Sequence, residues 1–169
     1  MRSATDILRD EHQLILHALL NLEHAAVRLG AGGRLPEDLW TRTICWFRAF
    51  ADRSHHAKEE TALFPAMVKG GVPSEGGPIA VMLQEHAEGR ALLATMYTGE
   101  PVDQAAAAHR YIRLLRDHID KENEILFPLA DAVLDERDQT EVSRQFADLE
   151  TQLGQTACLD HARDALARL

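Results

Sequence analysis

The sequence predicts an all-α protein, an up-down-up-down four-helix bundle with an additional C-terminal helix. Apolar residues recur at steps of three and four through long segments, which is the spacing of one helix face. Alternation of period two, which strands require, is nowhere sustained. Glycine and proline gather at 30–36, 70–78 and 99–101, so the connections between helices are short and favour antiparallel neighbours.

The first two helices are expected in the N-terminal third of the chain. The first begins near Thr5, a suitable N-cap, and ends at Leu29, because Gly30 is a stop signal. The second covers about residues 36–69 and starts with a proline suited to a first turn. Pro65 inside this segment is expected to kink the helix or end it early.

Three further helices are expected in the rest of the chain. They cover residues 78–98, about 101–135 and about 138–168. Gly154 weakens the middle of the last one. No linker interrupts the pattern, so residues 1–169 are predicted to form a single domain, with the bundle core at about 5–134.

Composition limits the classes of partner. The chain has 27 acidic and 18 basic residues and a formal net charge of -9, which disfavours nucleic acid and anionic membranes. Charges occupy the start of the chain, where a secretory signal has an apolar region, and no apolar stretch is long enough to cross a membrane. We therefore expect a cytoplasmic protein, and a homodimer is possible.

A duplicated motif carries the chemistry of this sequence. Residues 55–65 read HHAKEETALFP and residues 118–128 read HIDKENEILFP. Both contain His, then Glu four residues later, then Leu-Phe-Pro, at a constant separation of 63 residues. The dipeptide EH occurs at 11–12 and again at 85–86, so the pattern describes one helical hairpin used twice.

Helical phase indicates which polar residues point inward. His118 and Glu122 lie on the apolar stripe of the fourth helix, which continues to Ile125. His55 and Glu59 continue the stripe of the second helix. The neighbouring pair His56 and Glu60 follows Asp52 and Arg53 and is interpreted as part of a solvated face. Six inward candidates result: His12, His55, Glu59, His86, His118 and Glu122.

Buried carboxylates among four imidazoles need a partner, because an unpaired buried charge costs several kcal/mol or takes up a proton. Residues at i and i+4 are roughly 6 Å apart on a helix face and can address one ion or bridge two. This ligand set suits non-haem iron, with zinc or manganese possible. A single inward histidine is more often a hydrogen-bonded core residue, but six in matched phase favour a metal site.

The other candidate groups receive simpler interpretations. Arg90 lies four residues after His86 and either reaches the surface or pairs with an anion near the metal. Two cysteines, Cys45 and Cys158, are expected to be small buried hydrophobes. The unmatched histidines are interpreted as surface or supporting residues: His17, His24, His56, His109 and His161.

These motifs resemble those of the hemerythrin-like family, the His-His-Glu cation-binding domains, over about residues 5–134. The resemblance implies a four-helix bundle with two non-haem iron ions bridged by Glu59 and Glu122. It also implies that two histidines bind each iron: His12 and His55 on one, His86 and His118 on the other. The chain departs from the oxygen-carrying members, which have a histidine in place of Arg90 and an aspartate five residues after the histidine at 118.

The missing imidazole implies an open position on one iron, which suits a small oxidant better than reversible oxygen storage. The expected function is binding of, or reaction with, dioxygen, peroxide or nitric oxide, including peroxide decomposition with Arg90 as a catalytic residue. The alternatives are an iron or oxygen sensor without turnover and a metal-free interaction module. On this interpretation His118→Ala loses metal and His56→Ala does not.

Overall fold

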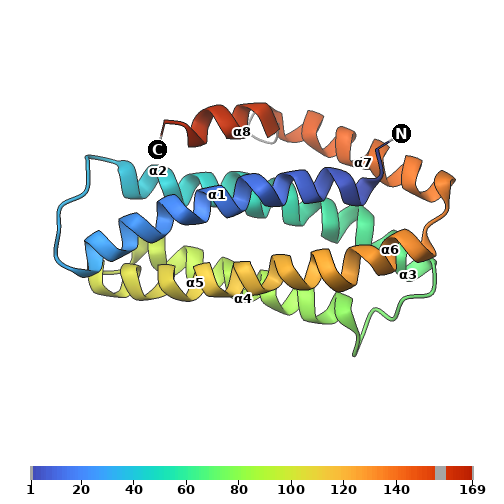
Figure 1. Ribbon diagram of the computed structural model, residues 1–169, viewed down its shortest axis with the longest axis horizontal. Helices are drawn as coiled ribbons and strands as arrows, with labels where there is room; N and C mark the ends of the chain where they lie inside the picture. Colours follow the sequence, from blue (N-terminus) through green and yellow to red (C-terminus); the bar gives the residue numbers. More distant parts are fainter. Residues whose placement is uncertain (1, 155–158, 169) are drawn as a thin grey trace.

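The computed structural model describes residues 2–154 and 159–168, and it confirms the predicted all-α bundle (Figure 1). The first hairpin is formed by α1 (Ala4–Gly30) and by a second helix made of α2 (Leu39–Trp46), η1 (Phe47–His56), η2 (Glu59–Leu63) and α3 (Phe64–Lys69). The second hairpin is formed by α4 (Pro78–Thr98) and by a helix made of α5 (Pro101–Lys121), η3 (Glu122–Leu126) and α6 (Phe127–Val133). The segments η1, η2 and η3 are π-helical.

The first helix begins earlier than expected because Ser3, not Thr5, caps it. The Ser3 hydroxyl accepts a hydrogen bond from the Asp6 backbone N–H at 3.1 Å, and the Asp6 carboxylate accepts one from the Ser3 N–H at 3.2 Å. This reciprocal pair satisfies two N–H groups that the helix itself cannot satisfy.

We expect Ser3→Ala to lower the free energy of unfolding by about 1 kcal/mol, because the substitution removes the cap. In a chain of this size that corresponds to a melting temperature lower by about 2–4 °C. Calorimetry of the metal-free protein measures the shift. A control at Thr95, whose hydroxyl contacts only the carbonyl of Ala91 one turn earlier, should stay near the wild-type value when changed to Ala.

The second helix starts at Leu39 rather than at Pro36, and Pro65 does not end it. Pro65 and Pro128 each lie in the first turn after a π-helical segment, and the helix continues through both. A π turn widens the helix and changes its hydrogen-bond register, which accommodates a residue without a backbone donor.

The π-helical segment η3 also shifts the phase of the inward face by one residue. Ile125, expected on the buried stripe, is 57% exposed, whereas Leu126 and Phe127 are buried. A regular period of 3.6 residues extends the stripe to Ile125, but the wider turn brings the next residue inward instead.

The predicted C-terminal helix is two helices, α7 (Glu136–Leu153) and α8 (Leu159–Leu166). Gly154 has φ of 72°, a conformation that glycine adopts easily, and it ends α7. Both helices form an added layer over α1 and the helix that runs from α2 to α3 (Figure 1). Within the described ranges, no helix combines the length and apolar content needed to cross a bilayer.

The buried apolar side chains form two clusters, one toward each end of the bundle. On α1, Leu8 belongs to one cluster and Ile15 to the other. The fourth helix repeats this division, with Leu115 in one cluster and Leu126 in the other. The polar candidates lie between these positions, in a layer that separates the two halves of the core.

Candidate metal centre

Two fully buried carboxylates, Glu59 and Glu122, form the middle of the layer between the apolar clusters. Each stands at the first residue of a π-helical segment, one in each hairpin. The Oε1 atom of Glu59 lies 3.5 Å from Nε2 of His55, in the same hairpin. Its Oε2 atom lies 3.4 Å from Nε2 of His86, in the other hairpin. Glu59 therefore presents one oxygen to each side of the centre.

Glu122 repeats this arrangement from the second hairpin. Its Oε1 atom lies 3.3 Å from Nε2 of His118, and its Oε2 atom lies 3.1 Å from Nε2 of His12. Both carboxylates thus span the boundary between the hairpins. This placement suits a carboxylate that bridges two cations, which the family resemblance implied for both residues.

Two groups of side chains have ligand atoms within 4.8 Å of one another, and Glu59 belongs to both. We name them group 1 and group 2. Group 1 consists of His12, His55, Glu59 and Glu122. Group 2 consists of His56, Glu59, His86 and His118. The structure therefore brings the six predicted residues together and adds a seventh.

Four of the imidazoles are oriented by a contact to their outer nitrogen. In each case Nδ1 lies against a side-chain oxygen, which turns the Nε2 atom toward the carboxylates. The contacts are His12 with Asn123 Oδ1 at 3.0 Å, His55 with Glu11 Oε2 at 2.8 Å, His86 with Glu60 Oε1 at 2.7 Å and His118 with Glu85 Oε2 at 2.9 Å. Metal-binding histidines in proteins are held in this way.

The inner atoms of the centre lack the partners that buried polar atoms normally have. All four oxygens of Glu59 and Glu122, and Nε2 of His12 and His55, make no hydrogen bond among the described residues. The oxygens approach imidazole nitrogens at 3.1–3.5 Å without hydrogen-bond geometry, as ligand atoms aimed at a common point do. Leaving so many buried polar atoms unpaired is costly, and a bound cation would satisfy them. The residues present therefore fit a metal.

His56 was expected on a solvated face, and this expectation is wrong. Its side chain is 5% exposed and its ring stacks on that of His86 with centroids 4.0 Å apart. The reason is the π-helical segment η1, because a wider turn brings His55 and His56 inward together. The imidazole position that seemed lost at Arg90 is thus supplied from the second helix.

Without a cation, protons balance the buried carboxylates. Burial alone would lower the pKa of His118, but the neighbouring carboxylate of Glu122 outweighs burial and raises this pKa to about 10. Burial and the nearby His86 and His118 lower the pKa of His56 well below its ordinary value, so this imidazole is neutral. A cation that replaces the protons on such groups binds more weakly as the pH falls.

The internal symmetry of the chain extends to the residues that support the candidate ligands. Lys58 and Lys121 are 63 residues apart and bond Glu11 and Glu85, the carboxylates of the two EH dipeptides. The sequence signal was the same separation of 63, which the sequence analysis applied only to the shared His, Glu, Leu, Phe and Pro. Both supporting pairs could have been found by extending it.

The Leu-Phe-Pro repeat has a related purpose. Phe127 stacks on His12 with ring centroids 5.3 Å apart, and Phe64 stacks on His86 at 6.0 Å. Each phenylalanine therefore packs against a histidine of the opposite hairpin. The repeat holds the two hairpins in register around the polar layer.

Arg90, predicted as a catalytic residue, belongs to neither group. Its guanidinium donates to Asp52 Oδ1 at 2.7 Å and to Glu60 Oε1 at 2.6 Å, and its side chain is 41% exposed. Because Glu60 in turn contacts His86, the printed contacts make Arg90 a support for that histidine. A direct role toward an oxidant stays a prediction.

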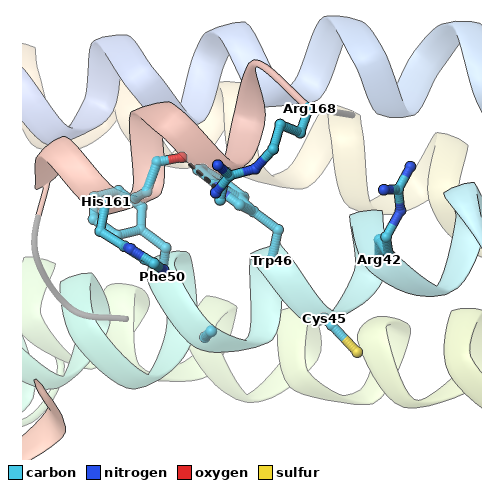
Figure 2. A pocket seen from close by; sticks show the side chains of 9 residues that line it. Arg42, Cys45, Trp46, Phe50, His161 and Arg168 are labelled. Atoms are coloured by element: carbon cyan, nitrogen blue, oxygen red, sulfur yellow. Dashed lines mark hydrogen bonds between the residues drawn. The ribbon is translucent and has the colours of Figure 1, made fainter. Parts of the chain in front are cut away.

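A surface pocket of about 310 Å³ lies between α2, η1 and α8, and none of its lining residues belongs to group 1 or group 2 (Figure 2). Trp46 in its floor donates a hydrogen bond to the carbonyl of Ala162 at 2.9 Å. Cys45 lines this pocket and is exposed, so the expectation of a buried thiol is wrong for it. Cys158 lies outside the described residues. His17 and His24 are exposed, as expected for surface histidines.

Comparison with known proteins identifies the family. The model of the Hemerythrin HHE cation binding domain matches residues 3–130. The chain belongs to this family. It is therefore a metal-binding protein of the hemerythrin type, and the recognition made from the duplicated motif is confirmed.

Curated relatives of this hemerythrin-like chain carry the name "Iron-sulfur cluster repair protein YtfE". Those of Escherichia coli (strain HS) and of Shigella boydii serotype 18 are both 40% identical to it over 90 residues. The matched region covers 46% of this chain and 40% of each relative, so it spans less than half of their length. No solved structure gave a significant match.

Proposed function

We propose that this hemerythrin-like chain holds two non-haem iron ions, one in group 1 and one in group 2, and reacts with a small oxidant. The observation that carries the proposal is that the oxygens of Glu59 and Glu122 face both groups without hydrogen-bond partners in the described residues. Iron bound by imidazole and carboxylate exchanges single electrons, which is the chemistry that peroxide, dioxygen or nitric oxide requires.

The protein's own residues hold this centre in an asymmetric form. Group 1 offers two imidazoles and two carboxylates, whereas group 2 offers three imidazoles and one carboxylate. Each group has four ligand-bearing side chains, fewer than the six positions that octahedral iron fills. Positions therefore remain for a small ligand. This favours a reacting centre over a purely structural one.

Entry of a small ligand is expected on the side of group 2. Asp52, Glu60 and Arg90 form a polar layer outside this group, with side chains 18%, 26% and 41% exposed. On the group 1 side, Lys58 and Glu11 are almost completely buried. A cationic guanidinium at the more open side favours approach of polar or anionic oxidants.

The function of the relatives supports a second candidate, in which the centre supplies iron to iron-sulfur clusters. The observations in its favour are the 40% identity to proteins named for cluster repair and the match to a cation-binding family. In that case the partly exposed side of group 2 is the expected exit for iron. The rival sensor hypothesis also uses occupancy of the centre without turnover.

Peroxide turnover distinguishes these candidates. Iron-loaded protein is mixed with a large excess of peroxide, and peroxide consumption and visible absorption are followed together. Decomposition converts two molecules of hydrogen peroxide into one dioxygen and two waters, so we expect consumption far beyond the iron present. The Glu122→Gln variant, which loses a bridging carboxylate, should not show it.

A different result would favour another candidate. A single spectral change without continued consumption supports a sensor, and transfer of iron to a cluster-free acceptor protein supports cluster repair. Metal content well below one ion per chain after anaerobic iron loading would contradict all of these candidates. It would leave the metal-free interaction module.

A further inference from the structure

The C-terminal helix α7 reaches the metal centre through one buried lysine. Lys58 is fully buried, and its ammonium group is bonded both by Glu11 of α1 and by Glu150 of α7, the latter at 2.6 Å. Helix α7 begins at Glu136, beyond residue 130, where the family match ends. The connection is therefore an addition to the matched domain.

We propose that α7 is a latch on the metal centre, in which Glu150 acts through Lys58 and Glu11 to hold His55 in its metal-binding orientation. The latch slows the release of metal from group 1. This inference rests on the proposed function, since it requires that a cation binds at His55. Glu150, Lys58 and Glu11 are positioning residues, because each acts on the metal through the next.

Glu11 transmits the position of Lys58 to the imidazole. One of its oxygens accepts from Nδ1 of His55 at 2.8 Å and the other accepts from Lys58, so both oxygens are engaged. Its side chain is 1% exposed, which keeps competing water away. A carboxylate held in this way fixes the ring of the histidine and increases its basicity as a ligand.

The docking of α7 and the burial of Lys58 are one structural event. Val142 and Phe146 of α7 are buried in the apolar cluster that also contains Leu63. The ammonium nitrogen of Lys58 lies 5.9 Å from the centre of the Phe146 ring. If α7 left this surface, Lys58 would lose the carboxylate of Glu150 and its cover together, and water would reach Glu11.

The second hairpin provides the comparison without a latch. There Lys121 bonds Glu85, which contacts His118 at 2.9 Å, so the inner part of the arrangement is the same. Lys121 is 37% exposed, however, and Glu85 is its only ion-pair partner among the described residues. The latch therefore distinguishes group 1 from group 2, although the sequence motifs that build them are duplicated.

Thermodynamic coupling makes the proposal reciprocal. If docked α7 strengthens binding at His55, metal at His55 must also stabilise docked α7 by the same free energy. The latch therefore predicts two linked observations, namely slower metal release with α7 docked and slower amide exchange in α7 with metal bound. A helix that only adds apolar burial predicts neither dependence.

Release of metal into a chelator tests the latch. Wild type, Glu150→Ala and the matched control Glu141→Ala are loaded with iron, their metal content is measured, and release is then followed by absorbance. Glu141 contacts only Arg144 and Gln145 on the exposed face of α7. We expect Glu150→Ala to release metal about tenfold faster in one kinetic phase, the order of supporting-residue effects, with Glu141→Ala unchanged.

Amide exchange of residues 142–153 is measured on the same samples with and without metal. Metal should slow this exchange in the wild type and in Glu141→Ala, but not in Glu150→Ala. Lys121→Met should alter release while leaving the metal effect on α7 intact. A wild type that takes up no metal refutes the proposed function and the latch together. Normal metal content with equal release in Glu150→Ala and wild type refutes the latch alone.

Discussion

His56→Ala is expected to lose at least half of the metal bound by the wild type, as His118→Ala does. This reverses the expectation from helical phase, in which His56 lay on a solvated face. Its ring is buried, stacks on His86 and lies at right angles to His118 with centroids 5.6 Å apart. Removing one imidazole from group 2 leaves it with fewer than four ligand-bearing side chains.

The measurement is elemental analysis of protein loaded anaerobically with iron and freed of excess metal. The matched control is His24→Ala, because His24 is exposed and belongs to neither group. We expect wild-type metal content in this control. Full metal content in His56→Ala would show that His56 only packs against His86 and is no ligand.

Metal loading is expected to raise the melting temperature of the wild type by about 5–10 °C. A ligand that binds only the folded chain, at about a hundred times its dissociation constant, stabilises it by about 2.7 kcal/mol per site. In a chain of this size, 1 kcal/mol corresponds to about 2–4 °C. The physical source is the set of buried oxygens and imidazole nitrogens that only a cation satisfies.

Calorimetry of metal-free and metal-loaded protein measures this shift, and a chelator should reverse it. The variant with both Glu59→Gln and Glu122→Gln should show a much smaller shift, because amides are poor replacements for bridging carboxylates. An equal shift in wild type and variant would mean that metal binds elsewhere on the chain. A control with Glu124→Gln, a change at an exposed carboxylate of the same segment, should keep the full shift.

Much of the site was predictable because the duplication made it redundant. Four histidines and two glutamates were found from a repeated spacing and from helical phase, and the structure places all six in one buried layer. Their role as metal ligands stays a prediction that the experiments above test. The fold class was equally accessible, since glycine and proline positions separate the long helices clearly.

The failures have one common physical cause. His56 and Ile125 were misplaced because periodicity assumes 3.6 residues per turn, whereas both lie in π-helical segments. A π turn forms where packing and buried ligands reward a wider helix, and no single residue type announces it. The position of Arg90 escaped for a different reason, because its partners Asp52 and Glu60 come from another helix.

The sequence by itself determined the helical bundle, its internal duplication and the six side chains that meet in the polar layer. Only the tertiary structure decided that His56 joins them, that Cys45 faces solvent, and that α7 reaches the centre through Lys58. Spacing along one helix fixes which side chains share a face. The partners opposite that face come from segments distant in the chain, such as the 92 residues that separate Lys58 from Glu150.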